Sequence, residues 1–417
     1  MMNEQLAILG GSKIKTTPYG TGKRFGEEEV KELVEALEQN TLFYHSGRKV
    51  KQFLERFNAL YGVTYSVATS SGTGALHVAI GSSGISVGDE VITSPITDAG
   101  SIIGILYQNA IPVFADLDPH TYNMTADTIR ARITPKTKAI IVVHLAGNPA
   151  DMDPIMALAR EHGLIVIEDC AQSYLTYYKG RLVGTIGDYG CFSTNDYKHI
   201  STGDGGIVTV NSQVAEDYQL THAFADKNYS RFGNVVQREM RLLAPNYRMT
   251  ELQGAVGIAQ LSKLIGICDK RSQYGDSLTS GIQDIPGIMP HQVTTDSRCT
   301  YWFYMFTIKP NVLSCSRDEF AEALQAEGID CSAGYIPQPV YMQPMFQNRE
   351  AYTGSHFPFD LSDIAYDEGL CPTAERILKQ AIRVPINEFF SEKDIEDMIA
   401  GIRKVAAHYS ASGLEIV

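Results

Sequence analysis

Short apolar segments alternate with segments of helical period through the first two-thirds of the chain. Residues 26–40 and 49–62 repeat their apolar positions every three to four residues, and the acidic first turn of 26–40 suits a helix start. The predicted strands are 90–94, 111–117, 138–145 and 164–170, and the helices between them include 125–133 and 151–163. Because these strands are apolar on both faces, the pattern predicts a largely parallel sheet covered by helices on both sides.

The pattern changes after about residue 265. Residues 248–278 have a helical period long enough for one helix or for two broken ones, which would connect two domains. The elements predicted beyond this segment are a strand at 301–308 and helices at 316–328 and 391–410. We therefore expect a large α/β domain over residues 1–265, with the N-terminal arm included, and a smaller C-terminal α/β domain over residues 266–417.

Composition and charge narrow the class of protein. No apolar run approaches the roughly 18 residues that span a bilayer, and the N-terminus lacks the basic start and apolar core of a secretory signal. The net charge of −13 argues against nucleic acid or an anionic membrane as a partner. A phosphorylated small molecule remains compatible with this charge, because a local pocket can oppose the global sign.

The cysteines predict a reducing compartment. There are seven of them, an odd number, and they are widely spaced with no CxxC pair. This spacing disfavours both a disulfide framework and a zinc site. We expect reduced thiols, no metal centre and a cytoplasmic protein. The positions are Cys170, Cys191, Cys268, Cys299, Cys315, Cys331 and Cys371.

Three stretches place reactive or polar groups at strand ends and helix starts. In 68–80, ATSSGTGALHVAI, small and hydroxyl residues lead into a helix, whose free backbone N–H groups can cradle a phosphate or simply be capped. Asp169 ends the apolar strand 164–170, where an open sheet places its ligand, although it can equally cap the next segment. Lys198 stands beside the glycine-rich stretch 202–206, where a lone lysine would ordinarily be a solvated surface charge.

Together these stretches supply what pyridoxal phosphate (PLP) requires. A lysine holds the cofactor's aldehyde as a Schiff base, an acid keeps the ring nitrogen protonated, and a phosphate anchor fixes the other end. A carboxylate about 3–4 Å from the pyridinium, at an effective dielectric near 20, contributes roughly 4–5 kcal/mol before desolvation is subtracted. The released lysine can then act as a general base.

At this level the chain resembles the DegT/StrS-type PLP-dependent sugar aminotransferases, which have the aspartate aminotransferase fold (fold type I). The resemblance runs from about Pro18 to His408. It is carried by nine blocks in order, among them SGRKVKQFLERFNALYGV, ATSSGTGALHVAI, GLIVIEDCAQS, KHISTGDGG and NYRMTELQGAVGIAQL. It implies a mostly parallel seven-stranded sheet covered by helices, followed by a smaller C-terminal α/β domain.

The resemblance also implies roles for individual residues. Lys198 would form the covalent link to PLP, and Asp169 would pair with the ring nitrogen. The other expected cofactor contacts are Gln172 against the ring near its hydroxyl, Gly72, Thr73 and Ser193 at the phosphate, and Asn246 at the phosphate of the neighbouring subunit's cofactor. A homodimer with shared active sites follows from the role of Asn246.

The implied activity is transfer of an amino group from L-glutamate or L-glutamine to a keto sugar, a nucleotide-linked keto sugar or a keto-cyclitol. Such reactions belong to amino-sugar, secondary-metabolite or surface-polysaccharide biosynthesis. Two alternatives use the same fold: a PLP-dependent sugar dehydratase or lyase, and a non-catalytic PLP-binding regulator. Relatives that became dehydratases carry histidine in place of the lysine, so Lys198 favours the aminotransferase.

One position departs from the family pattern. The slot that usually holds an aromatic residue stacked on the PLP ring falls on Asp98, in PITDAGS. Either the alignment slips by a residue or two, or the substrate side of the pocket is unusual. His144, at the end of a predicted strand, is interpreted as a structural histidine rather than a catalyst.

Overall fold

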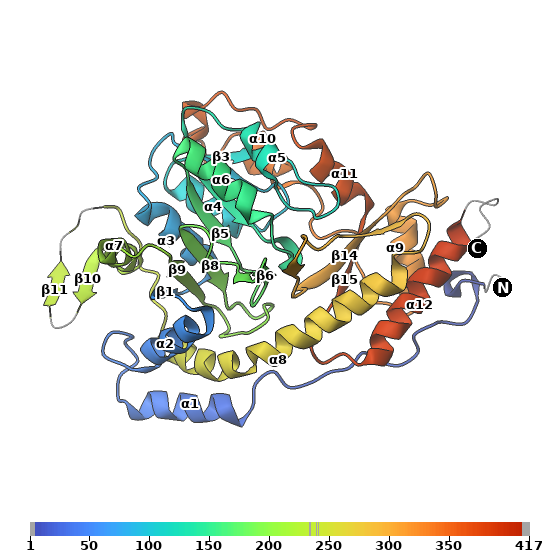
Figure 1. Ribbon diagram of the computed structural model, residues 1–417, viewed down its shortest axis with the longest axis horizontal. Helices are drawn as coiled ribbons and strands as arrows, with labels where there is room; N and C mark the ends of the chain where they lie inside the picture. Colours follow the sequence, from blue (N-terminus) through green and yellow to red (C-terminus); the bar gives the residue numbers. More distant parts are fainter. Residues whose placement is uncertain (1–4, 233–234, 239, 241, 411–417) are drawn as a thin grey trace.

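The protein is described by a computed structural model that covers residues 5–232, 235–238, 240 and 242–410 (Figure 1). A seven-stranded sheet forms the centre of the larger part, and a three-stranded sheet forms the centre of the smaller one. Each helix and strand predicted from the sequence is present, with ends that differ by a few residues. The predicted fold class is confirmed.

The strands divide among four sheets. The central sheet has the order β1-β9-β8-β5-β4-β2-β3, and β12-β14-β15, β13-β6-β7 and β10-β11 form the smaller ones. The strands are β1 (Tyr65–Thr69), β2 (Glu90–Thr93), β3 (Ile111–Phe114), β4 (Thr137–Val143), β5 (Ile165–Asp169), β6 (Tyr177–Tyr178), β7 (Arg181–Leu182), β8 (Tyr189–Ser193), β9 (Gly206–Val210), β10 (Tyr229–Phe232), β11 (Val235–Arg238), β12 (Ile288–Pro290), β13 (Ser297–Arg298), β14 (Phe303–Ile308) and β15 (Ala381–Pro385).

Helices cover both faces of the central sheet (Figure 1). They are α1 (Glu27–Glu38), α2 (Lys49–Tyr61), α3 (Gly72–Ser82), α4 (Gly100–Tyr107), α5 (Ala126–Arg130), α6 (Met152–His162), α7 (Ala215–Ala225), α8 (Glu251–Ile282), α9 (Arg317–Ala326), α10 (Pro344–Gln347), α11 (Pro372–Gln380) and α12 (Glu392–Tyr409), with short 3-10 turns at Ala7–Leu9, Leu145–Gly147, Val340–Met342 and Phe359–Leu361.

The direction of the strands fixes where a ligand can bind. Strands β8, β5, β4, β2 and β3 pair in parallel, whereas β9 runs antiparallel to both β1 and β8. All strands except β9 therefore end at the same edge. Open α/β sheets bind their ligands at this carboxyl edge, which here carries the ends of β5 and β8.

Local sequence explains how the main helices begin and end. Helix α2 ends at Gly62, whose φ of 67° lies in the left-handed region that glycine tolerates. Helix α8 begins with a capping box in which Thr250 Oγ1 accepts from the N–H of Gln253, and that glutamine side chain accepts from the N–H of Thr250. Of the two alternatives for residues 248–278, a single continuous helix is the one observed.

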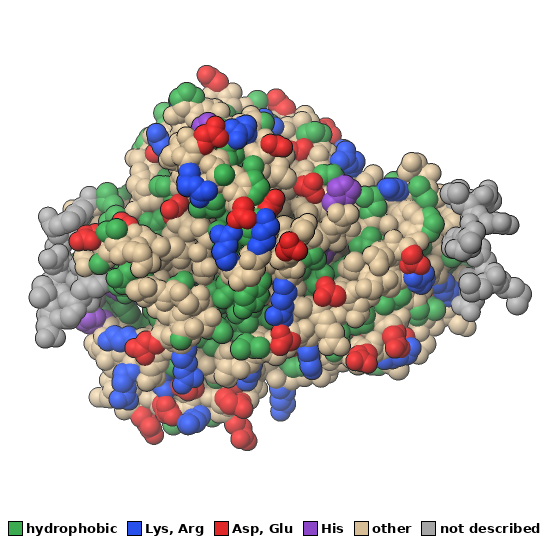
Figure 2. Space-filling view, viewed as in Figure 1, with side chains coloured by type: hydrophobic (Ala, Val, Ile, Leu, Met, Phe, Trp, Pro, Cys, Tyr) green, Lys and Arg blue, Asp and Glu red, His purple; other side chains and the backbone are tan. Residues whose placement is uncertain are grey.

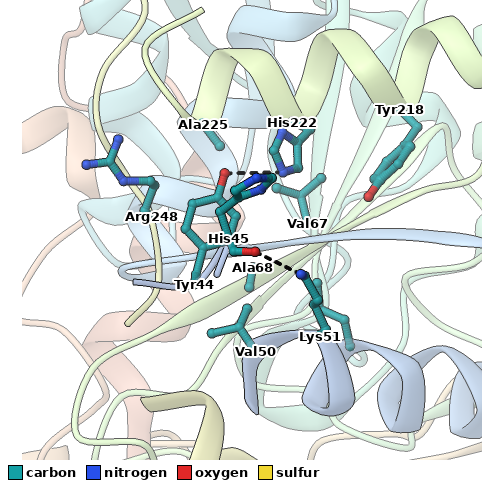
Figure 3. A pocket seen from close by; sticks show the side chains of 11 residues that line it. Tyr44, His45, Val50, Lys51, Val67, Ala68, Tyr218, His222, Ala225 and Arg248 are labelled. Atoms are coloured by element: carbon teal, nitrogen blue, oxygen red, sulfur yellow. Dashed lines mark hydrogen bonds between the residues drawn. The ribbon is translucent and has the colours of Figure 1, made fainter. Parts of the chain in front are cut away.

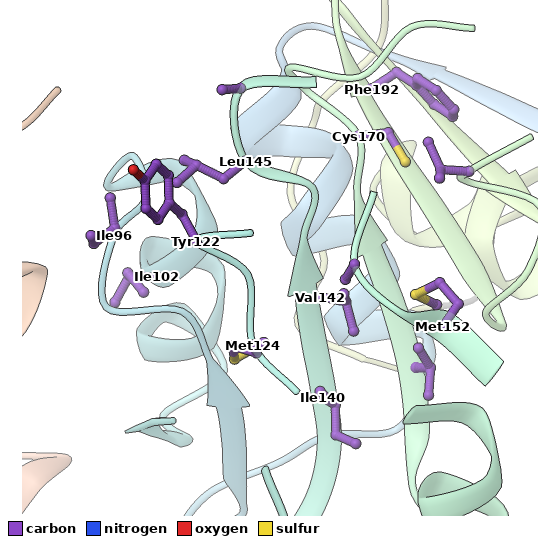
Figure 4. Packing of buried hydrophobic residues seen from close by; sticks show 14 of the residues in the cluster. Ile96, Ile102, Tyr122, Met124, Ile140, Val142, Leu145, Met152, Cys170 and Phe192 are labelled. Carbon is purple, nitrogen blue, oxygen red and sulfur yellow. The ribbon is translucent and has the colours of Figure 1, made fainter. Parts of the chain in front are cut away.

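The core of the larger part lies between the sheet and its helices (Figure 4). Ile140 and Val142 of β4 point into the same layer as Met152 of α6 and Cys170 beyond β5. Phe57 and Tyr61 of α2 stack with ring centroids 4.3 Å apart and meet Phe192 of β8 edge-on. This packing holds the carboxyl ends of β4, β5 and β8 in fixed positions.

A second core joins the chain's two ends. It contains Tyr304 of β14, Ile382 of β15 and Met398 of α12, together with Leu6 from the N-terminal segment. The buried Lys15 ammonium also pairs with Asp394 of α12. The N-terminal arm therefore packs against C-terminal elements, and α8 contacts both α2 and α12 along its length (Figure 1).

The surface carries mixed charge. On the face shown in Figure 2, acidic and basic side chains are interspersed. Within the described residues, we find no helix that combines the length and the apolar character needed to cross a membrane.

Candidate active site

Lys198 lies in the loop that joins β8 to β9, at the carboxyl edge of the sheet. Glycine at the end of this loop permits close contact with the start of α3. A Cβ on Gly206 would lie 2.3 Å from the carbonyl oxygen of Ser71, so only glycine fits there. The loop is also held from outside, because Arg24 Nη2 donates to the carbonyl oxygen of Lys198 at 3.0 Å.

The Lys198 amine is largely withdrawn from solvent. Its Nζ lies 3.6 Å from the centroid of the Trp302 ring, a cation–π distance. Burial lowers the pKa of Lys198 to about 8, although the negative charges of Asp169 and Asp98 oppose this shift. The amine is therefore neutral in a larger fraction of molecules near neutral pH than an ordinary lysine is, and the neutral form is the nucleophile.

Asp169 ends β5 with a buried carboxylate. Its Oδ2 accepts from Ser101 Oγ at 2.6 Å, and its Oδ1 accepts from the N–H of Ala171 at 3.1 Å. Burial raises the pKa of Asp169, and these hydrogen bonds and the charge of Lys198 oppose the shift. A cationic ring nitrogen beside this carboxylate would offset the cost of burying it.

The first turn of α3 lies against the end of β8. Ser71 caps the helix by accepting from the N–H of Gly74 at 2.9 Å. A Cβ on Gly72 would lie 2.6 Å from the Cβ of Ser193, so the helix start and the strand end are in close contact. The backbone N–H groups of Gly72 and Thr73, at a helix N-terminus and beside the Ser193 hydroxyl, suit an anionic group.

An aromatic wall from the smaller part faces these residues. Gln172 Oε1 accepts from the N–H of Ala146 at 2.7 Å, and its Nε2 donates to the Tyr335 hydroxyl at 3.3 Å. The Tyr335 ring packs 4.8 Å from Phe303 and edge-on to Trp302 at 5.8 Å between centroids. Burial, followed by the charges of Asp98 and Asp169, raises the pKa of Tyr335, so this hydroxyl stays neutral and can donate.

Asp98 lies at the same site. Its Oδ1 accepts from the N–H of Gly100 at 2.9 Å, and its charge acts on Lys198, Asp169 and Tyr335. A Cβ on Gly100 would lie 2.8 Å from Thr73 Oγ1 and 3.2 Å from Asp98 Oδ1, which places both side chains at the start of α4. Asp98 therefore lies beside Thr73 at this site, and Trp302 is the ring beside the lysine amine.

Six of the seven expected cofactor contacts are thus brought together, and the seventh lies apart. Asn246 is exposed and forms an isolated antiparallel bridge with Asp226. No contact joins it to Lys198 or Asp169 within the described residues. Its expected role concerns the neighbouring subunit, which a single chain does not contain.

A buried cluster next to Asp169 is structural. His144 Nε2 lies 3.0 Å from Glu168 Oε2, and Cys170 is close enough to complete a metal-like group. However, the N–H of Ala150 donates to His144 Nδ1 at 3.1 Å, so Nε2 carries the proton that bonds to Glu168. Glu168 also accepts from the backbone N–H groups of Gly184, Ile186 and Gly187. All these groups are satisfied within the fold, as the structural interpretation of His144 requires.

Two cavities among the described residues lie apart from the expected cofactor contacts. A cavity of about 140 Å³ between α2, β1 and α7 is lined by Tyr44, His222 and Arg248 and contains none of the expected cofactor contacts (Figure 3). The other, of about 330 Å³, is open and is lined by Arg24 and Asp196. It adjoins the Lys198 loop, so the N-terminal arm forms part of the surroundings of the site.

Comparison with known proteins identifies the family. The family model of the DegT/DnrJ/EryC1/StrS aminotransferases matches residues 23–403. The chain belongs to this family. It is therefore an aminotransferase, and the cofactor of this family is PLP.

Relatives are similar over most of their length. A GDP-perosamine synthase of Escherichia coli O157:H7 is 33% identical over 90% of this chain and 98% of its own. A putative L-glutamine:3-amino-2,3-dideoxy-scyllo-inosose aminotransferase of Streptoalloteichus tenebrarius is 33% identical over 83% of each chain. The solved structure of an aminotransferase from Psychrobacter cryohalolentis superposes with a TM-score of 0.83 at 30% identity, over 94% of this chain and 100% of that one.

The donor set of this aminotransferase fits PLP. One edge of the sheet carries the Lys198 amine, the buried Asp169 carboxylate and the N-terminus of α3 with the neighbouring Ser193 hydroxyl. Gln172 lies between these groups and the aromatic wall. When bound, PLP supplies an electron sink for a substrate's amino carbon.

Sequence reasoning missed two residues of the site, Trp302 and Ser101. Tyr335 begins the segment 335–346, which the resemblance places near the substrate, although its aromatic residues and prolines equally suit a packed loop. Trp302 is the only tryptophan in the chain, and its position at the start of the predicted strand 301–308 was a usable signal. Ser101 gave none, because serine is common in such segments. Only the fold brings Ser101 onto the carboxylate of Asp169.

Proposed function

We propose that this protein transfers an amino group from L-glutamate or L-glutamine to a keto sugar, a nucleotide-linked keto sugar or a keto-cyclitol. The observation that carries the proposal is the convergence of Lys198, Asp169 and the first turn of α3 at the carboxyl edge of the sheet. The relatives' names support the acceptor class, since one is a GDP-perosamine synthase and the other is named a putative aminotransferase for L-glutamine and an amino-dideoxy-scyllo-inosose.

In this proposal each residue has one task. Lys198 would hold the cofactor through its amine, and the same amine would move a proton at the substrate carbon, for which a pKa of about 8 is well suited. Asp169, oriented by Ser101, holds the proton on the ring nitrogen. Gly72, Thr73 and Ser193 bind the phosphate. Gln172, tied to Tyr335, fixes the ring's angle.

Absorption of the purified protein tests the donor step. We expect PLP to give the visible band of a lysine-linked cofactor, and L-glutamate or L-glutamine to convert it to the pyridoxamine form. The donor that converts it faster is the physiological one. Omitting the amino acid is the control. A band that neither donor changes, with a product that has lost water and gained no nitrogen, would contradict amino transfer and select the dehydratase.

We further propose a homodimer in which Asn246 completes the neighbouring site. The support is that Asn246 is exposed and lies apart from its own chain's cofactor contacts. All seven cysteines are buried and form no disulfide with one another, which supports a cytoplasmic location.

Subunit mixing tests the shared site. Alone, Lys198→Ala and Asn246→Ala homodimers are each expected to be impaired. In a mixed dimer, one site carries both defects and the other carries neither. We expect refolded mixtures to recover about half of the wild-type activity per mixed dimer, because one of its two sites is intact. Activity no higher than the sum of the two separate variants would show that Asn246 does not act across subunits.

A further inference from the structure

Trp302 directly precedes β14, and its half-buried ring faces the Lys198 amine, with the lysine Nζ 3.6 Å from the ring centroid. The backbone N–H of Trp302 donates to the carbonyl oxygen of Ala146 at 3.0 Å, and Arg271 Nη1 donates to the carbonyl oxygen of Trp302 at 3.2 Å. The ring also packs edge-on to Tyr335, with 5.8 Å between the centroids. Contacts that do not involve Lys198 therefore set the position of the indole.

Hydrogen bonds on both sides of Lys198 join its loop to the segment that carries Trp302. Before the lysine, Trp302 Nε1 donates to the carbonyl oxygen of Tyr197 at 2.6 Å. After it, His199 Nε2 donates to the carbonyl oxygen of Thr300 at 3.1 Å. Burial lowers the pKa of His199 well below its usual value, so this ring is neutral, and its single N–H lies on Nε2 because a carbonyl oxygen only accepts. The lysine and the indole are therefore held together as a pair.

The Trp302 ring is the direct neighbour of the Lys198 amine. Within the described part of the chain, Lys198 Nζ has no hydrogen bond and no ion pair, and Asp169 and Asp98 act on it through their charge at longer range. The face of an aromatic ring attracts an ammonium group, most strongly when the ring is tryptophan and where water is excluded. The contact therefore stabilises the charged form of the amine against the effect of burial.

We propose that Trp302 is a positioning residue, which holds the amine of Lys198 when this amine is not bonded to the cofactor. A lysine side chain is a flexible four-carbon stem, so an amine without a partner samples many positions. Contact with the ring restricts it to one position at the edge of the sheet where the substrate reacts. This inference rests on the proposed function, because amino transfer frees the lysine amine and uses it as a base.

The fluorescence of the indole tests the contact, because Trp302 is the only tryptophan in the chain. The full-length protein freed of PLP is titrated from about pH 6 to 9, which spans the pKa of Lys198. We expect the emission to change with a midpoint near pH 8, as the ammonium over the ring loses its proton. The change should be absent in Lys198→Met, which keeps a long side chain without the charge. An equal titration in Lys198→Met would overturn the proposal.

Other ionisable groups around the pair do not account for a midpoint near pH 8. Burial raises the pKa of the Tyr335 hydroxyl and lowers that of His199, so both groups are neutral throughout this range. The charged groups nearby are two carboxylates and two guanidinium groups, those of Asp98, Asp169, Arg24 and Arg271. The comparison with Lys198→Met assigns the midpoint, since this variant keeps all of these groups.

Substitution of Trp302 tests whether the ring face acts on the amine or only excludes water. The pyridoxamine form of the enzyme leaves the Lys198 amine free, and its rate of acetylation at increasing pH, followed by mass spectrometry, gives its pKa. We expect Trp302→Leu to lower this pKa by about 0.4 to 1.5 pH units, as for a lost cation–π contact. Trp302→Phe keeps a ring and should lower it less. An unchanged or raised pKa in Trp302→Leu would overturn the proposal.

The kinetics of the donor step test the positioning role. We expect Trp302→Leu to lower the limiting rate with saturating L-glutamate by about 3- to 30-fold, because the amine is less often in place, with little change in the half-saturating concentration. Trp302→Phe should recover part of the rate. A limiting rate equal to that of the wild type would overturn the role.

Tyr107→Leu is the matched control, because this aromatic residue of α4 is exposed. Its Lys198 pKa and limiting rate should equal those of the wild type, and losses as large as those of Trp302→Leu would overturn the proposal. The proposed function fails in a different way. If the indole titrates with Lys198 in the wild type but neither L-glutamate nor L-glutamine converts the cofactor, the positioning contact stands and the proposed amino transfer does not.

Discussion

Lys198→Ala is expected to abolish the covalent link to PLP and to lower amino transfer by about 10⁴-fold, the upper range for loss of a positioned general base that is also the nucleophile. No other lysine among the described residues lies against Trp302. Single-turnover absorbance with L-glutamate measures the loss, and mass spectrometry after borohydride reduction measures the link.

The same variant should fold normally. The half-buried Lys198 amine has a desolvation cost, which its contact with Trp302 and the charges of Asp169 and Asp98 offset in part, so its removal should change stability little. We expect the apoprotein's melting temperature to be equal to or above that of the wild type. Lys138→Ala, at an exposed position of β4, is the control and should keep full activity. Amino transfer retained by the Lys198 variant would contradict the assignment.

The second large effect on the rate of amino transfer is expected from Asp169→Asn. Losing the carboxylate removes the charge that holds the ring nitrogen protonated, which is worth roughly 4–5 kcal/mol at 3–4 Å and an effective dielectric near 20. We therefore expect the rate of amino transfer to fall by about 10³-fold, with PLP still attached to Lys198. The rate of conversion by saturating L-glutamate measures the change.

Asp98→Asn tests whether the effect of Asp169 comes from its pairing with the ring nitrogen or from any negative charge in the pocket. Asp98 shares the pocket, but within the described part of the chain its Oδ1 accepts a hydrogen bond from the N–H of Gly100 alone, in its own loop. Its charge raises the pKa values of both Lys198 and Asp169. Asp98→Asn should lower both pKa values, move the rate profile toward lower pH and cost less than tenfold at the optimum. Equal losses in the two variants would contradict a specific role for Asp169.

The sequence by itself determined the fold class and most of the cofactor contacts. Long helices such as 49–62 and 391–410 bury one face against the rest of the protein. Their apolar residues therefore recur every three to four positions, and this repeat is visible in the sequence. Lys198, Asp169 and the start of α3 lie at strand ends and helix starts, and the order of these elements along the chain already places them at one edge of a parallel sheet.

Helix continuity needed the tertiary structure. Glycines in 248–278 left open whether the helix breaks, because glycine weakens an isolated helix. In the fold, Gly254 and Gly257 are contact points: a Cβ would lie 2.7 Å from the backbone nitrogen of Val50 and 2.7 Å from the Phe53 ring, respectively. Close packing against α2 therefore accounts for the glycines, and α8 continues through them.

The substrate side of the site was also decided by tertiary structure. Trp302 and Tyr335 come from the smaller part, more than 100 residues after Lys198, and they reach the site only when the smaller part packs against the larger part. Sequence patterns report contacts within an element and its immediate neighbours. Contacts between distant segments depend on how the two parts of the molecule pack against each other, and that packing decides which aromatic ring covers the lysine.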